Sequence, residues 1–163
     1  MKPLALGFAS CEGWAGTFQV MIATRFAVGL HILILVASDP PGEATSVRLA
    51  RSIGTNPVVV RRIAGLLSRA GLIAVQRGPG GAALTRPAEA ITLRDVWRAI
   101  HPAKEALMRV HGRGNAACEV GLKVPPLLRA RFDATEAVML EDLGQTSLAE
   151  LVEQAKTEAT TNA

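Results

Sequence analysis

Arginine side chains dominate one stretch of the chain that contains no acidic residue. Between residues 44 and 88 the sequence has neither Asp nor Glu and seven arginines, namely Arg48, Arg51, Arg61, Arg62, Arg69, Arg77 and Arg86. The rest of the chain holds more acidic than basic side chains, although the whole chain has a formal charge of +4. Solvated protein faces usually mix the two signs of charge. We therefore expect this segment to meet a polyanion, and specifically nucleic acid.

A glycine-rich stretch, RGPGGAAL, begins at Arg77. One interpretation is a phosphate-binding loop, which would follow a strand, open a helix and, in its P-loop form, end in Gly-Lys-Ser/Thr. That context is missing here. The other interpretation is a tight β-hairpin, because short strand-like segments, LIAVQR and AALTR, flank the glycines. We expect the hairpin, with Arg77, Gly78 and Gly80 at or beside its tip.

Two short helices are predicted directly before the hairpin. Thr45 or Ser46 can cap the first helix, which runs to about Ile53 and is ended by Gly54. Asn56 followed by Pro57 is a strong start signal for the second helix, which runs to Ala70. The second helix has one apolar side, formed by Val60, Ile63, Leu66, Leu67 and Ala70, and leaves Val58, Arg61, Arg62, Ser68 and Arg69 largely outside.

Two helices joined by a short glycine-containing turn form a helix-turn-helix, and the hairpin makes it a winged helix. The capped second helix would then enter a major groove, while Arg77 reaches a minor groove or phosphates. The predicted fold class is mainly α with a small β-hairpin: a winged helix-turn-helix domain plus a long C-terminal dimerisation helix.

The whole chain can be divided into five expected segments around the winged helix. We expect an N-terminal extension over residues 1–20, a DNA-binding domain over 21–100, a sensor-type loop over 101–123, dimerisation helices over 124–155 and a disordered tail over 156–163. The DNA-binding domain would begin with an apolar helix over residues 22–37 and end with a helix capped by the TLRD sequence. A helix as apolar as the first one requires cover on more than one face, which suggests a partner subunit.

Composition excludes several classes of protein. The two cysteines, Cys11 and Cys118, are too far apart for a CxxC motif and too few for a disulfide framework, which fits a reducing cytoplasm. The apolar run before Cys11 is too short for a signal peptide, and the longest apolar stretch, residues 26–37, is too short for a membrane helix. No nucleophile with a base and an orienting group is present. We expect a cytoplasmic protein that does not bind a membrane, is no enzyme and has no catalytic residues.

The sequence from about residue 21 to residue 152 resembles the Rrf2 family of bacterial winged-helix transcription regulators. The resemblance rests on RFAVGLHILILVA, LARSIGTNPVVVRRIAGLLSRAGLI, RGPGGAALTRPAEAITLRDVWRAI and CEVG. It implies a homodimer on a pseudo-palindromic operator of double-stranded DNA. The expected interface residues are Phe26, Leu30, Leu128, Phe132 and Met139, and the expected DNA-binding residues are Ser46, Thr55, Asn56, Pro57, Val58, Arg61, Arg62, Arg77, Gly78 and Gly80.

The chain departs from the members of this family that bind an iron–sulfur cluster. Those members carry a series of cysteines before the long helix, and here only Cys118 fills such a position, with Gly112 and Ala106 at the others. The first-helix position that supplies a ligand in some members is Arg25 or Gly29. One thiolate cannot supply the ligands of a cluster, so the resemblance implies a cluster-free member with no cofactor and no metal.

Three roles remain open around Cys118. Its basic neighbours would stabilise a thiolate, so it is a candidate redox-sensing thiol, but a plain structural cysteine in the loop fits equally well. His101 and His111 could join it in a metal site. A small-molecule effector between the winged helix and the dimer helices is a further alternative.

Two function classes follow from these observations. The first is a sequence-specific DNA-binding regulator, and within that class a homodimeric repressor that responds to redox state or to a small effector. The second is a winged-helix module that binds another protein. Charge separates the two, because a protein-binding face has no reason to keep so many arginines and no acid.

Overall fold

The computed structural model describes residues 17–76, 80–101, 106–112 and 117–161. Its elements follow the chain as α1 (Thr17–Ser38), α2 (Ser46–Ile53), α3 (Pro57–Arg69), β1 (Ile73–Val75), β2 (Ala82–Leu84), the short 3-10 helix η1 (Ala88–Ala90), α4 (Leu93–Ile100), α5 (Glu119–Leu143) and α6 (Leu148–Thr161). The predicted fold class, mainly α with a small β-hairpin, is confirmed.

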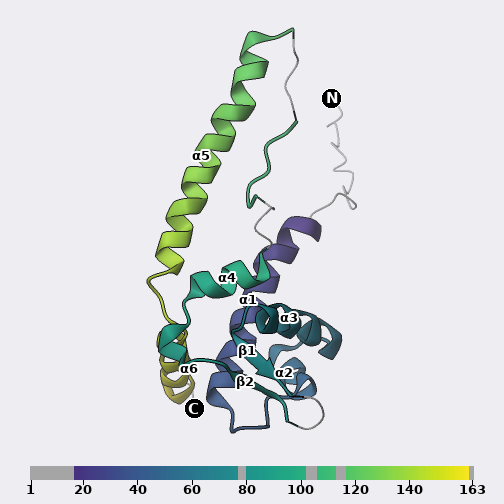
Figure 1. The fold of residues 1–163 in the computed structure, drawn as a ribbon, viewed down its shortest axis with the longest axis vertical. Coiled ribbons are helices and arrows are strands. Elements are labelled where there is room, and N and C mark those ends of the chain that lie inside the picture. The colour runs from purple at the N-terminus through teal and green to yellow at the C-terminus, as the bar shows by residue number, and fades with distance from the viewer. Residues whose placement is uncertain (1–16, 77–79, 102–105, 113–116, 162–163) are drawn as a thin grey trace, which may run out of the picture.

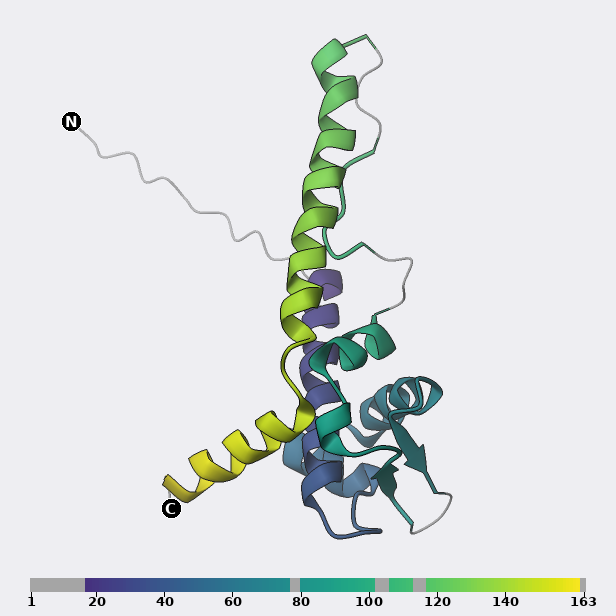
Figure 2. The same cartoon turned by 60° about the vertical axis from the view of Figure 1, so that its left-hand side comes forward.

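Helix α1 lies at the centre of the packing and contacts α2, α3, α4, α6 and β2. Ile32 and Leu33 of α1 are fully buried, as are Val60 and Leu67 of α3. Figures 1 and 2 show α5 projecting away from this body, whereas α6 returns to it. The hydrophobic core therefore belongs to the winged helix together with α6. No helix of the described segments is long and apolar enough to cross a membrane.

The helix boundaries around the turn agree with the local sequence signals. Thr45 caps α2, and Gly54 ends it with a positive φ of 70°. The Asn56 side chain accepts a hydrogen bond from the Val58 amide at 2.8 Å, and Pro57 occupies the first turn of α3. The Thr92–Asp95 capping box at the start of α4 is also present.

The hairpin is fixed to the chain before α2. β1 and β2 pair antiparallel with Val75 opposite Ala82, and the Ala82 amide donates to the Ala44 carbonyl at 3.0 Å. Gly81 has a φ of 63°, and a Cβ there would lie 3.0 Å from the Gly42 carbonyl oxygen. Only glycine satisfies both constraints. The predicted tip residues Arg77 and Gly78 lie outside the described residues.

Three predicted boundaries were wrong. Helix α1 begins at Thr17 rather than Ile22, because no glycine or proline separates these residues. Helix α5 begins at Glu119, although the loop was expected to reach residue 123. Pro125 and Pro126 thus lie inside α5, where the turn before them is exposed enough for water to bond the freed carbonyls.

Helix α6 is longer than expected, since it continues through most of the predicted disordered tail to Thr161. Lys156 forms an ion pair with Glu153 at 2.7 Å, and the segment is rich in residues with high helix propensity. Two hydrogen bonds fix the start of α6, from the Leu93 amide to the Thr146 carbonyl at 3.1 Å and from the Leu148 amide to the Ile91 carbonyl at 2.8 Å.

We predict that Gly81→Ala destabilises the fold more than Gly54→Ala does. Both glycines have a positive φ, which costs an L-residue about 1–2 kcal/mol. Only Gly81 is also crowded by backbone, whereas a Cβ on Gly54 would meet nothing within 4 Å. Urea unfolding should give a loss of about 1 kcal/mol for Gly54→Ala and about 2–3 kcal/mol for Gly81→Ala. Equal losses would contradict the attachment of the hairpin to the chain before α2.

Candidate nucleic-acid interface

The outer side of α3 is a stripe formed by Val58, Arg62 and Arg69. These residues are separated by four and seven positions, so they lie on one side of the helix, away from the buried side chains of Val60, Ile63 and Leu67. All three are exposed, and Val58 keeps 62% of its surface accessible. An exposed stripe of one apolar and two cationic side chains can contact base edges and phosphates in a major groove.

Asn56 is exposed directly before this stripe, but its chemistry is restricted. Its side-chain oxygen caps α3 by accepting the Val58 amide. Bidentate recognition of adenine uses both the oxygen and the amide nitrogen of an asparagine. The capping bond leaves the NH₂ group as the available donor, so Asn56 is suited to a phosphate or to a single base acceptor.

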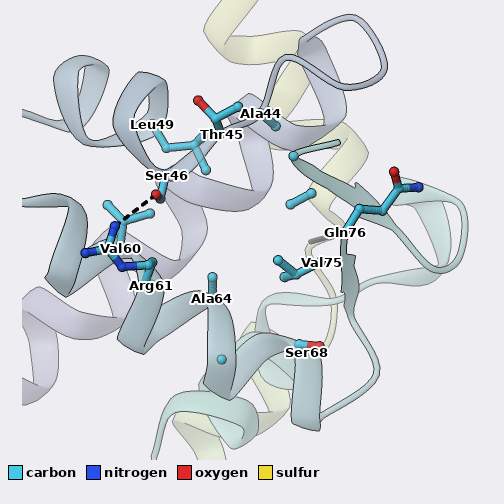
Figure 3. Close-up of a pocket in the computed structure, with 13 residues that line it drawn as sticks. Ala44, Thr45, Ser46, Leu49, Val60, Arg61, Ala64, Ser68, Val75 and Gln76 are labelled. Carbon is cyan, nitrogen blue, oxygen red and sulfur yellow. Dashed lines mark hydrogen bonds between the residues drawn. The ribbon is translucent and has the colours of Figure 1, made fainter. Parts of the chain in front are cut away.

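Arg61 lies beside the stripe and is oriented toward α2. Its Nη1 donates to the Ser46 hydroxyl oxygen at 3.3 Å, a bond that Figure 3 shows as a dashed line. Arg62 is exposed on the neighbouring side of the helix. The two consecutive arginines therefore differ in direction. Ser46, Thr55 and Pro57, which were predicted to bind DNA, are half-buried around the turn, and Gly80 is half-buried in the hairpin.

Two of the seven arginines are neutralised by acids outside the acid-free segment. Arg48 pairs with Asp39 at 2.7 Å and with Glu43 at 3.5 Å, and Arg86 pairs with Asp95 at 2.8 Å. The hydrogen bond from Arg48 holds the pKa of Asp39 below its ordinary value. Among the described residues, Arg51, Arg61, Arg62 and Arg69 form no ion pair. The positive charge is thus smaller than the sequence count suggests and is concentrated on α2 and α3.

A groove of about 490 Å³ separates α3 from the hairpin. The start of α2, one side of α3 and the strands line it, and Figure 3 shows Ala64 and Val75 facing each other across the space. Gly65 also lines the groove. Sequence analysis missed this feature, and a glycine in the middle of an otherwise regular helix was the available signal.

Helix α5 carries an apolar stripe that differs from the predicted dimer contacts. Val120, Leu127 and Val138 lie on one side of the helix, seven and eleven residues apart, and are 68, 68 and 67% exposed. The predicted contacts Leu128, Phe132 and Met139 are half-buried, as are Phe26 and Leu30 on α1. The ring of Phe26 packs edge-on against Trp97 of the same chain, with centroids 5.2 Å apart.

Cys118 is exposed and caps α5, where its Sγ accepts a hydrogen bond from the Gly121 amide at 3.3 Å. His101 is buried and stacks on Trp97 with ring centroids 4.9 Å apart, while His111 is exposed. Within the described residues, no three His, Cys, Asp or Glu side chains gather to hold a metal ion.

We predict opposite stability effects for alanine at two helical glycines. A Cβ on Gly65 would approach only Arg69 Nη1, at 3.7 Å, whereas a Cβ on Gly29 would lie 2.4 Å from Ile100 Cδ1. Gly65→Ala should raise the free energy of unfolding by about 0.5–1 kcal/mol, because alanine has the higher helix propensity. Gly29→Ala should lower it by about 1–3 kcal/mol through overpacking. Thermal and urea unfolding test both, and a destabilised Gly65→Ala protein would show that the space beside Gly65 is not open.

Comparisons with known proteins agree with this geometry. Residues 22–154 match the Rrf2 family, described as iron-dependent transcriptional regulators. YwnA of Bacillus subtilis, a proposed HTH-type transcriptional regulator, is 36% identical over 132 residues, which are 81% of this chain and 97% of YwnA. A crystal structure of a proposed DNA-binding protein is 32% identical with a TM-score of 0.64 and covers 78% of this chain and 97% of its own. Staphylococcus aureus CymR shares the fold, with 24% identity, a TM-score of 0.58 and coverage of 80% of this chain and 96% of CymR.

The family description implies iron, but the described residues do not fit an iron–sulfur cluster. Cys118 is exposed at a helix end and belongs to no group of three His, Cys, Asp or Glu side chains among the described residues, and Gly112 and Ala106 offer no side chain that could bind iron. On α1, Gly29 likewise offers no side chain that could bind iron, and a Cβ there would lie 2.4 Å from Ile100 Cδ1.

The match over most of the chain, the identity with YwnA and the winged helix with its exposed α3 lead to one conclusion. A regulator of this kind contacts DNA rather than catalysing a reaction. The chain belongs to the Rrf2 family of transcriptional regulators.

Proposed function

We propose that this protein is a sequence-specific, homodimeric repressor that binds a pseudo-palindromic operator with α3 in the major groove. The observation that carries the proposal is the outer stripe of α3, where exposed Arg62 and Arg69 have no carboxylate partner among the described residues. A protein-binding winged helix is the weaker alternative, because those charges would remain unpaired against most protein surfaces.

The two consecutive arginines take different roles in this proposal. Arg62 shares the outer stripe with Val58, so it is assigned to base edges, with Val58 against a thymine methyl group. Arg61 is held toward the start of α2 by Ser46, so it is assigned to the phosphate backbone. The wing residues Arg77, Gly78 and Gly80 are assigned to the flanking minor groove on the basis of the sequence.

The dimer forms through α5. Val120, Leu127 and Val138 are exposed apolar side chains on one side of α5, and Arg131 lies on the same side between the last two. A second α5 packed antiparallel across this stripe would bury it and place two winged helices on two half-sites. The half-buried residues Leu128, Phe132 and Met139 would then border the contact.

A response to redox state is a further part of the proposal. Cys118 is exposed at the start of α5, so an oxidant can reach its thiol. Its Sγ caps that helix, so oxidation would alter the end of the element that carries the dimer contact.

We predict that the two arginines separate in DNA binding. Arg62→Ala should lose about 1–3 kcal/mol of discrimination between the operator and a duplex with one substituted base pair in each half-site. Arg61→Ala should weaken binding to both duplexes alike and reduce the slope of log K against log salt concentration by about one unit. Fluorescence anisotropy with DNA from upstream of the protein's own gene, at several salt concentrations, measures both quantities.

The matched control is Arg129→Ala, which removes an exposed arginine from α5, a helix that projects away from the winged helix. This variant should retain wild-type discrimination and salt slope. If Arg61→Ala and Arg62→Ala behave identically in both measurements, the division between phosphate and base contacts is wrong.

We also predict that Leu127→Glu produces a monomer by light scattering, because a carboxylate would be buried at the centre of the α5 stripe. Operator affinity should fall by at least about tenfold, as one half-site is lost. Leu122→Glu is the control, since Leu122 is also exposed but lies on the other side of α5. A Leu127→Glu dimer with normal operator affinity would refute this interface.

A further inference from the structure

The groove beside α3 has the size of a small-molecule site. Its volume of about 490 Å³ falls within the range of roughly 300–1,000 Å³ that is usual for ligand pockets. It is formed within the winged helix itself, by the start of α2, α3 and the two strands. Hydrogen bonds from Ala82 to Ala44 and from Gln76 to Gly81 fix the walls.

Gly65 keeps one wall of the groove open. Glycine is unfavourable inside a helix, and the protein's own packing does not require it here, because a Cβ would meet nothing closer than 3.7 Å. Gly65 is seven residues from Val58, so it lies at the edge of the groove that borders the outer stripe of α3. A long side chain at this position could reach over the groove, and no neighbour in the fold would prevent it.

The floor of the groove is apolar. Leu49, Val60 and Ala82 are buried there, and Val75 remains 53% exposed on the facing strand. Figure 3 shows the Val75 side chain directed toward α3 across the open space. An apolar body in this space would cover Val75, whereas a phosphate group would leave the floor without favourable contacts.

One end of the groove is cationic. Arg61 lines it and is held by Ser46, and no acidic residue belongs to the lining. A guanidinium without a carboxylate partner among the described residues favours an anion at this end. Among its described lining residues, the groove thus combines an apolar floor with one positive side chain.

We propose that this groove binds a small organic anion, with its apolar body between Ala64 and Val75 and its carboxylate on Arg61. The bound anion occupies the guanidinium that otherwise contacts a DNA phosphate, so it releases the protein from DNA. This second part rests on the proposed DNA-binding role of α3, whereas the binding of the anion does not.

The test is titration calorimetry of the full chain with 1-naphthoate in the absence of DNA. We expect a Kd of about 1 mM or tighter, as is usual for a ligand of this size. The neutral analogue 1-naphthalenemethanol should bind at least tenfold more weakly. Arg61→Ala should remove this preference for the anion, whereas Arg62→Ala, which alters the adjacent arginine outside the groove lining, should keep it.

Three further variants separate the groove from other sites. Gly65→Leu should weaken naphthoate binding at least tenfold by filling the space. Val75→Glu should do the same, because a charged side chain would replace the apolar surface against the naphthalene body, whereas Val75→Leu should retain binding. Because Val75 is exposed, its variants should fold even if Gly65→Leu does not, and circular dichroism confirms folding of each.

The proposal is overturned if naphthoate does not bind or binds no more tightly than the neutral analogue. It is also overturned if naphthoate binds Val75→Glu and folded Gly65→Leu as tightly as it binds wild type. A third result also overturns the proposal: Gly65→Leu loses affinity for DNA, and wild type binds no naphthoate. The groove would then hold only the DNA backbone. In the DNA assay, naphthoate should compete with the operator on wild type but not on Val75→Glu. If naphthoate binds as expected and wild type binds no DNA, the anion site stands and the proposed function fails.

Discussion

Burial of α1 on several sides at once is the packing constraint on which the exposed outer side of α3 depends. Helix α3 places its buried side chains, among them Val60 and Leu67, in the core that α1 centres. Its opposite side is then necessarily exposed, and Val58, Arg62 and Arg69 form the outer stripe because of this packing. The same core holds α6 against α1, so the chain returns to the winged helix after α5 has extended away from it.

The wing is positioned by backbone geometry rather than by side-chain packing. Gly81 adopts a positive φ and a close backbone contact that favour glycine, and its neighbour Ala82 bonds to Ala44 before α2. This attachment sets the distance between the hairpin and α3, and so creates the groove. Arg61 lies between the outer stripe of α3 and the groove, so in the two proposals one guanidinium serves either DNA or a small anion.

Local signals allowed much of the fold to be predicted. Asn56 before Pro57 and Gly54 after α2 specify helix ends through their own backbone chemistry, and the structure has these ends where they were expected. Features that depend on distant residues were not predictable. The ion pair of Arg48 with Asp39 joins two segments across a turn, and the groove arises only when the hairpin packs beside α3. The apolar stripe of α5 was not recognised in the sequence, because Val120, its first residue, precedes the two prolines that were taken as the start of that helix.

The central claim is that α3 of this chain recognises a specific DNA sequence as part of a dimer. In vitro selection from a pool of random duplexes tests it most directly, because it assumes neither an operator nor an effector. The account predicts enrichment of an inverted repeat whose half-sites are centred about one helical turn apart, and loss of that enrichment with Arg62→Ala. Binding that enriches no motif, or the same motif selected by Arg62→Ala, would contradict it.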